Sequence, residues 1–281
     1  MKKILVNKMR EWLVLSMIFA ILFIVLIVQV KHIKQEEKNV VTLYDIAFDT
    51  NKKHGYKIFL SENGQLEPYF VVTNDYYGQG NVLLLREYVW DTPMKIQERS
   101  ETSYYATSFP DDFLNREFIH RFSEELREKI PTTRVLIRDN RFVDGSRSFE
   151  RIQRKLFLLS LHELSPYTRK MWDEPSLEFF RQIEYIKAFL IDDWEGNVWK
   201  RETYWWLRSD MTGERIFTNA VTDKGKLTLT STQSELYIRP ALTLPPKLPV
   251  ERIEINGESI FVLQGFDFET VNEKVFVQMK N

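Results

Sequence analysis

The 281-residue chain contains no cysteine. This absence excludes disulfide bonds, thiolate metal sites, redox pairs and any mechanism that needs a thiol nucleophile. Secreted eukaryotic domains of this size often carry disulfides, so the absence fits a bacterial surface protein stabilised by its core, although a cysteine-free cytosolic protein would look the same. Glycine and proline are also scarce, at ten residues each. A chain with so few of them and 14% aromatic residues is neither low-complexity nor disordered.

The chain has almost no net charge, with a formal value of −1. A nucleic-acid binder needs a surplus of lysine and arginine on one face, so we expect no nucleic-acid partner. Hydrophobic residues make up 43% of the chain, which is enough for one sizeable core or two small ones.

One long run has no charge at all: residues 12–30, WLVLSMIFAILFIVLIVQV. As a helix this run is roughly 28 Å long, about the thickness of a bilayer's hydrocarbon core. A buried soluble helix rarely runs this far without a polar face. A cleavable signal peptide has a shorter apolar part and ends in small residues, whereas this run ends in Val30-Lys31. The run therefore predicts an uncleaved transmembrane helix.

The flanking charges predict the orientation of this helix. Four lysines and arginines precede the span and three follow it closely, so the bias places the amino terminus in the cytoplasm. The expected organisation is a cytoplasmic tail, a transmembrane helix, a stalk, a globular extracytoplasmic domain and a C-terminal β-hairpin appendage. These parts are expected at 1–11, 12–30, 31–50, 51–246 and 247–281.

The outer part of the chain predicts an α+β fold, a mixed β-sheet with two main helices. In residues 111–130 apolar side chains recur every four positions and Pro131 follows, which predicts one amphipathic helix. Residues 175–191 predict the second helix, with Asp173 as its N-cap. Alternating or apolar runs bounded by turn residues predict strands at 56–60, 69–73, 82–90, 135–139, 155–160, 204–209, 215–222, 226–230 and 236–244.

A hairpin signal stands near the C-terminus. Apolar residues alternate on both sides of Asn256-Gly257, within residues 251–264. This segment is expected to form either a small β appendage or an added edge of the same sheet.

Two sequence blocks resemble a known family. The chain has YWWLRS at 204–209 and YIRPAL at 237–242, and this pair resembles an uncharacterised bacterial family with a W-W-L-R-S … V-R-P-A-L signature. FLNREF at 113–118 and LFLLSLHEL at 156–164 look like two further blocks of that family. Its Ser-Pro-Gly turn is replaced here by Ser209-Asp210-Met211. The resemblance implies a surface location and, by looser analogy, a fold similar to C-type lectins and formylglycine-generating enzymes.

Enzyme signatures are mostly missing. The chain has no G-x-S-x-G elbow, no Walker loop and no H-E-x-x-H, and its four histidines show no metal spacing. An oxidase of the formylglycine type is excluded, because its copper needs cysteines. Ser160, His162 and Glu163 do not form a triad on a strand, where neighbours alternate between faces. We therefore expect no catalytic residue, no metal and no cofactor.

The paired acids allow one rival interpretation. Asp111 with Asp112, and Asp192 with Asp193 and Glu195, are candidates for the two carboxyls of a glycosidase. Such pairs more often mark a helix cap or a turn. The second cluster also lacks the alternating spacing of a calcium loop, so a turn is favoured there.

The candidate binding residues are Trp205, Trp206, Arg208 and Arg239. On a strand the two tryptophans point to opposite faces, so one enters the core and the other is buried by helices or open to a sugar. The two arginine blocks are expected on neighbouring strands of one sheet, with the arginines fixing its packing. We expect a membrane-anchored extracytoplasmic module that binds an envelope glycan or protein. The alternatives are a surface hydrolase acting on wall polymer and a structural partner of another membrane protein.

Overall fold

The computed structural model describes residues 22–23, 25, 40–50, 56–98, 103–138, 149–165, 176–195, 197–211, 214–255, 257–272, 274–275 and 277. The chain divides into two compact units, residues 1–41 and 42–281. The predicted transmembrane helix at 12–30 lies outside the described residues except for Leu22, Phe23 and Val25. Among the residues that are described, no helix is both long and apolar enough to cross a membrane.

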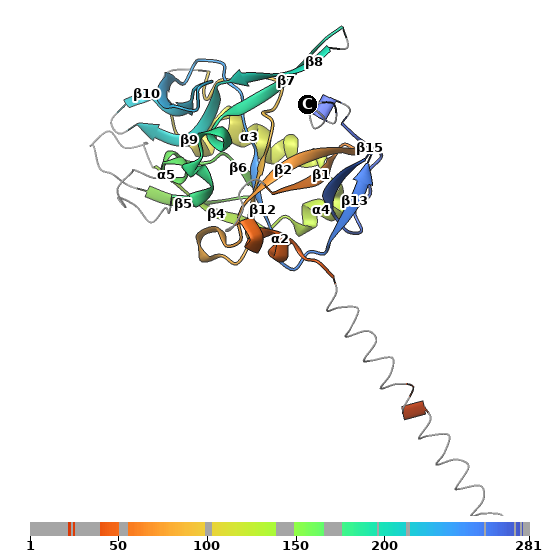
Figure 1. The fold of residues 1–281 in the computed structure, drawn as a ribbon. Coiled ribbons are helices and arrows are strands. Elements are labelled where there is room, and N and C mark those ends of the chain that lie inside the picture. Colours follow the sequence, from red (N-terminus) through yellow and green to blue (C-terminus); the bar gives the residue numbers. More distant parts are fainter. Residues whose placement is uncertain are drawn as a thin grey trace, which may run out of the picture. The chain divides into compact units, whose positions relative to one another are not determined.

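The second unit is α+β and mostly β (Figure 1). Its main sheet has eight strands in the order β13-β14-β1-β2-β3-β12-β6, and β15 pairs with β2 off this path. The pairs β1–β14 and β2–β15 are parallel and the others are antiparallel. The strands are β1 (Lys57–Glu62), β2 (Gln65–Thr73), β3 (Val82–Arg86), β6 (Leu156–Phe157), β12 (Ala241–Leu244), β13 (Val250–Ile255), β14 (Glu258–Leu263) and β15 (Thr270–Val271).

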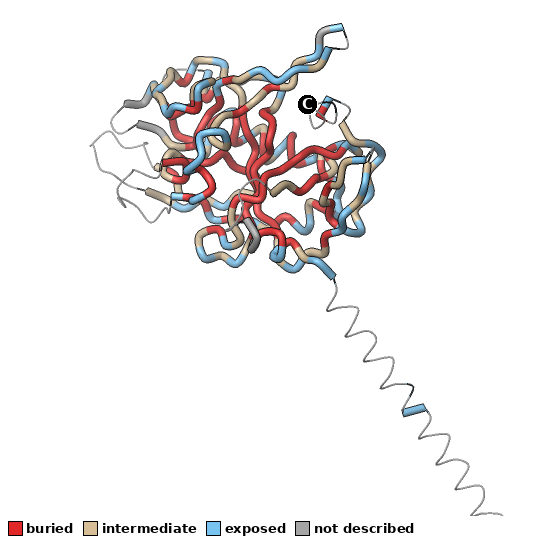
Figure 2. The backbone as a smooth tube through the Cα atoms, viewed as in Figure 1, coloured by how far each residue is buried: buried red, intermediate tan, exposed pale blue. Residues whose placement is uncertain are grey.

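The central strands of this sheet are buried on both faces. In β3, Val82 and Leu84 pack into one apolar cluster and Leu83 and Leu85 into a second. All four side chains are completely buried, because alternate residues of a strand point to opposite faces and both faces are covered. Figure 2 shows buried residues concentrated along these strands.

Three smaller sheets complete the described β-structure. A three-stranded antiparallel sheet has the order β11-β10-β9, and two hairpin pairs are formed by β4 with β5 and by β7 with β8. Their bounds are β4 (Thr133–Arg138), β5 (Phe149–Arg154), β7 (Ala188–Trp194), β8 (Asn197–Thr203), β9 (Trp205–Met211), β10 (Glu214–Val221) and β11 (Leu227–Ser231).

The single helix expected at 111–130 is wrong. The segment forms α3 (Phe109–Arg116), the 3-10 turn η3 (Phe118–Arg121) and α4 (Glu124–Lys129). Apolar residues spaced by four drift roughly 40° per step around a continuous helix. The breaks cancel this drift, so Leu114, Phe118, Phe122, Leu126 and Ile130 are all buried.

The helix expected at 175–191 is also wrong in extent. The described part holds the 3-10 turn η4 (Glu178–Arg181), the one-turn α6 (Ile183–Ile186) and then β7. Ile183 in this segment is exposed. Pairing of β7 with β8 satisfies the backbone of residues 188–194, and this tertiary contact overrides the local helical spacing.

The stalk expected at 31–50 is wrong from residue 43 onward. Helix α2 (Leu43–Thr50) belongs to the second unit, and its residues Leu43, Ile46 and Ala47 are buried in the core. These positions, i, i+3 and i+4, form the apolar face of an amphipathic helix.

The C-terminal hairpin is confirmed, and it extends the main sheet. β13 and β14 form it, and β14 then pairs in parallel with β1, aligning Val262 with Phe59. Of the two expected arrangements, the added sheet edge is therefore the one observed.

Candidate functional site

The two adjacent tryptophans lie on β9 and face opposite clusters, as the alternation predicts. Trp205 packs into one apolar cluster and Trp206 into the other, and both are completely buried. Their indole N–H groups donate to the carbonyl oxygens of Ile186 at 3.1 Å and Met94 at 2.8 Å. Neither ring has a face open to solvent, so both act as core residues in this structure.

The tryptophan segment and the late arginine segment run side by side, but in different sheets. Trp205 forms a parallel bridge with Tyr237, and the backbone N–H of Trp206 donates to the Tyr237 carbonyl oxygen at 2.9 Å. Beyond this bridge β9 continues with β10, while β12 joins the main sheet. The expectation of one shared sheet is wrong, because the pairing between the two segments does not extend past the bridge.

Arg208 is completely buried and forms a two-pronged ion pair with Glu163. Nη1 donates to Glu163 Oε2 at 2.8 Å, and Nη2 donates to Oε1 at 3.0 Å. The guanidinium also donates to the carbonyl oxygens of Leu136 and Leu158 at 3.0 and 2.7 Å, and to the Tyr77 hydroxyl at 3.4 Å. The planar fork of arginine suits this arrangement, which lysine cannot reproduce.

The carboxylate of Glu163 also has several hydrogen-bond donors around it. It accepts hydrogen bonds from the hydroxyls of Tyr76 and Tyr77 at 2.5 and 2.9 Å and from the Ser160 amide at 2.6 Å. Burial raises the pKa of Glu163, but the Arg208 charge and these hydrogen bonds outweigh burial and hold the pKa below its usual value.

Glu163 reaches this position because the chain turns into a helix at Ser160. The strand expected at 155–160 is only β6, and Ser160 caps α5 (Leu161–Leu164) in a reciprocal capping box with Glu163. Ser160 and Glu163 are therefore committed to a helix cap and to Arg208, so no triad with His162 forms. Sequence reasoning missed Glu163 as the partner of Arg208; the signal was the Ser-x-x-Glu spacing of the capping box.

Arg239 is completely buried among carbonyl oxygens and aromatic rings. Nε donates to the carbonyl oxygen of Arg86 at 2.8 Å, and Nη1 donates to that of Tyr185 at 2.9 Å. The guanidinium lies 5.6 and 5.4 Å from the ring centroids of Phe70 and Trp205. Burial lowers the pKa of Arg239 to about 9. This side chain joins β3, α6 and the core, and is not accessible to a ligand.

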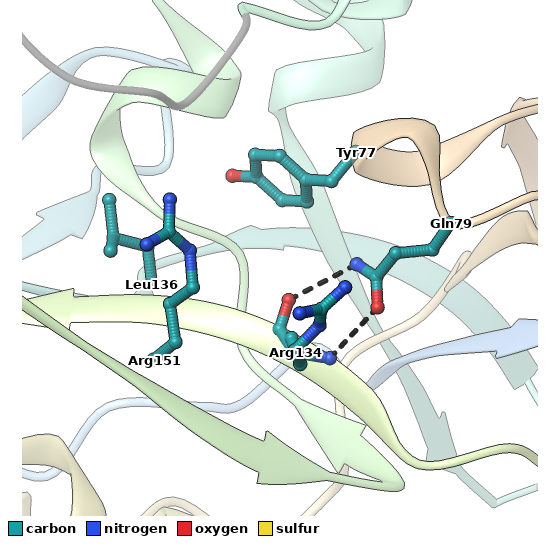
Figure 3. Close-up of a pocket in the computed structure, with 5 residues that line it drawn as sticks. All are labelled: Tyr77, Gln79, Arg134, Leu136 and Arg151. Atoms are coloured by element: carbon teal, nitrogen blue, oxygen red, sulfur yellow. Dashed lines mark hydrogen bonds between the residues drawn. The ribbon is translucent and has the colours of Figure 1, made fainter.

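An open pocket of about 360 Å³ lies next to Arg208 (Figure 3). Tyr77 and Leu136 line the pocket and both accept hydrogen bonds from the guanidinium. The side-chain amide of Gln79 clamps the backbone of Arg134, accepting from its N–H at 3.1 Å and donating to its carbonyl oxygen at 3.3 Å. The lining residues are Tyr77, Gln79, Arg134, Leu136 and Arg151.

No sequence pattern had singled out these five residues. Four come from strand β4, strand β5 and the 3-10 turn η1 (Tyr76–Gly78), and Gln79 follows that turn. Of these elements, β5 was not predicted. The buried arginine of the W-W-L-R-S block thus supports a surface pocket built by residues that are distant in sequence.

The acids of the rival interpretation do not converge. Asp192 pairs with Arg201 at 2.6 Å, and Glu195 is exposed at the turn between β7 and β8. Asp193 lies 3.6 Å from Lys274 across a separate groove of about 840 Å³. Of this cluster only Glu195 lies in the expected turn, because Asp192 and Asp193 belong to strand β7.

The two carboxyls of the first acidic pair, Asp111 and Asp112, also have separate partners. Asp111 is buried against Arg154 at 2.8 Å, while Asp112 pairs with Arg116 on the surface at 2.8 Å. Burial raises the pKa of Asp111, and the hydrogen bonds from Arg154 oppose this shift. Within the described part of the chain, no group of three or more His, Asp or Glu side chains is placed to hold a metal ion.

Comparisons with known proteins give one match. A family model described as Domain of unknown function (DUF6273) matches residues 79–246. The match contains Glu163, Arg208, Arg239 and the pocket residues Gln79 to Arg151, but not Tyr77 or the C-terminal hairpin. No curated protein matches the chain. No solved structure matches it either.

Proposed function

The chain belongs to the family described as Domain of unknown function (DUF6273), and we propose that it is a membrane-anchored, extracytoplasmic binding module. Its ligand is a component of the cell envelope, a glycan or a protein, held in the pocket beside Arg208. The uncharged run at 12–30 supports the anchor, and the four-to-three bias of lysine and arginine supports a cytoplasmic amino terminus.

The observation that carries the proposal is the pocket itself. It is open, polar and supported from inside by a fully buried ion pair that fixes two of its five lining residues. Binding sites need side chains that are held in place before the ligand arrives. The described part of its lining holds no carboxyl group, histidine, serine or threonine to act as acid, base or nucleophile.

A C-type-lectin-like arrangement is part of this proposal. The bridge between the tryptophan segment at Trp205 and the late arginine segment at Tyr237 supports it. Because a fold alone does not carry a function, the ligand class rests on the pocket.

The rival hydrolase would act through Asp193 and Glu195. Asp193 lines the larger groove, where burial raises the pKa of Glu67 against the opposing charge of Arg86. The third reading, a structural partner of another membrane protein, requires neither cavity.

Co-sedimentation separates these functions. Full-length protein in detergent micelles is mixed with insoluble cell-wall polymer, and the bound fraction and released soluble sugar are both measured. We expect retention without release. Leu136→Trp, which fills the pocket without changing charge, should abolish retention, whereas Asp193→Asn and Glu195→Gln should leave it unchanged.

Two results would contradict the proposal. Retention unaffected by Leu136→Trp would remove the pocket as the site. Soluble sugar released by the wild-type protein and lost in Asp193→Asn and Glu195→Gln would establish the hydrolase instead.

A further inference from the structure

The pairing of β4 with β5 places two arginines on one face. Arg151 lies directly opposite Leu136, and Arg134 is two residues before Leu136 on the same strand. Residues opposite each other and residues two apart share a face. Arg134 and Arg151 are therefore diagonal neighbours, with Cβ atoms roughly 7–8 Å apart, on the face that lines the pocket.

A third arginine occupies the same face. Arg138 is two residues beyond Leu136 in β4, and its charge helps to lower the pKa of His162, after the larger effect of burial. The charge of Arg208 lowers the pKa of His162 further, and the charge of Glu163 raises it. Among the residues that the structure describes, the pocket lining holds two arginines and no aspartate or glutamate.

Polar groups complete the lining around these cations. The Tyr77 ring extends toward Leu136 and Arg151 in Figure 3, and its hydroxyl is oriented by Glu163 and Arg208. Tyr77 has a φ of 56°, which is uncommon for a residue with a side chain and is found more often at functional sites than elsewhere. The Gln79 side-chain amide is hydrogen-bonded to both the N–H and the carbonyl oxygen of Arg134.

We infer that this pocket binds an oxyanion, a phosphate or carboxylate group carried on an envelope glycan; this inference rests on the proposed binding function. Guanidinium groups bind both anions through paired N–H donors. The volume of about 360 Å³ exceeds what a single ion needs and falls in the range of small-molecule sites. An anionic sugar unit therefore fits better than free phosphate.

Binding of defined polymers to the full-length protein in micelles tests the inference. The probes are a phosphodiester-linked glycerol polymer, a uronic-acid polymer, neutral dextran, inorganic phosphate and vesicles of phosphatidylglycerol. We expect one or both anionic polymers to bind, dextran not to bind, and inorganic phosphate to compete weakly. The two polymers distinguish phosphate from carboxylate.

Variants assign the binding to the two arginines. Arg134→Ala and Arg151→Ala should each weaken polymer binding about tenfold, and the double variant about a hundredfold, as expected for loss of charge-assisted hydrogen bonds. Arg134→Lys should recover part of the loss, because it restores charge without the fork. Arg116→Ala removes an exposed charge from α3 and should have no effect.

The outcomes separate this inference from the proposed function. One outcome is that dextran binds as strongly as the charged polymers, and that Leu136→Trp blocks this binding but the double arginine variant does not. This outcome would contradict anion recognition and would still support the pocket as a binding site. Binding confined to vesicles would overturn the glycan as carrier. If Leu136→Trp has no effect on any probe, the inference and the proposed function both fail.

Discussion

Arg208 on β9 and Glu163 on α5 form an ion pair in which neither side chain is exposed to solvent. A buried pair gains little net free energy over apolar residues, because both charges lose their hydration. Losing one partner is costly, since the other charge then stays buried alone. In this protein the pair also orients the Tyr77 hydroxyl, so it links the core to the pocket.

The first prediction concerns the pH dependence of stability. The folded pKa of Glu163 is held below its unfolded value near 4.5, so its ionised form stabilises the folded state above that pH. This contribution disappears as pH falls through the depressed folded pKa. Glu163→Gln should lower the free energy of unfolding by about 3–5 kcal/mol at pH 7, and the difference from wild type should shrink below about pH 4.

Denaturant unfolding of both proteins between pH 3 and pH 7 measures this difference. The variant must be compared with wild type at each pH, because Glu67 and Asp111 have raised pKa values. Their effect on the pH dependence of stability is opposite to that of Glu163. Glu128→Gln on the exposed face of α4 is the matched control and should follow wild type. A Glu163→Gln deficit that does not vary with pH would refute the assigned ionisation.

The second prediction separates the two buried arginines. Arg208→Ala leaves the Glu163 carboxylate buried without its cation and should cost about 3–5 kcal/mol. Arg239→Ala leaves neutral carbonyl oxygens without a donor, at about 1–3 kcal/mol each. Arg208→Ala leaves the carbonyl oxygens of Leu136 and Leu158 without a donor in addition to the carboxylate. The greater loss is expected for Arg208→Ala. Chemical denaturation of both variants measures which one loses more stability. Unchanged stability in both would contradict the packing role and would make the arginines candidates for ligand contacts.

The third prediction concerns the C-terminal hairpin. Ile260 on β14 is buried at the edge of the main sheet, in a cluster with Phe59 and Val262. Ile260→Ala should lower the free energy of unfolding by about 2–5 kcal/mol, as for other buried truncations. The exposed Glu251→Ala on β13 should stay within about 0.5 kcal/mol of wild type. A neutral Ile260→Ala would show that the hairpin contributes little to the fold.

The fourth prediction concerns topology. Protease added to intact protoplasts should digest the chain beyond residue 31, because the uncharged run and its flanks predict that this part lies outside. A cytoplasmic marker protein in the same sample should stay intact. Protection of the chain until the cells are lysed would contradict the predicted orientation.

Local patterns in the sequence determined the elements whose formation depends on neighbouring residues. The turn at Asn63-Gly64, where both residues have positive φ, joins β1 to β2 as its residue types predict. Alternation around Gly257 predicted the C-terminal hairpin, and alternation at Trp205 and Trp206 predicted their opposite faces. These features follow from backbone sterics and from a side-chain period of two.

Only the folded structure decided the rest, because hydrogen-bond partners on other residues compete with the preference of a segment taken alone. The apolar spacing at 111–130 reads as one helix until Ser108 and Ser123 cap two separate ones. Residues 188–194 become a strand only when β8 supplies hydrogen bonds. Arg208 was recognisable as a cation needing a partner, but folding brings it to Glu163, 45 residues away. The pocket depends on the pairing of β4 with β5, so the positions of Arg134 and Arg151 follow from contacts that no local pattern encodes.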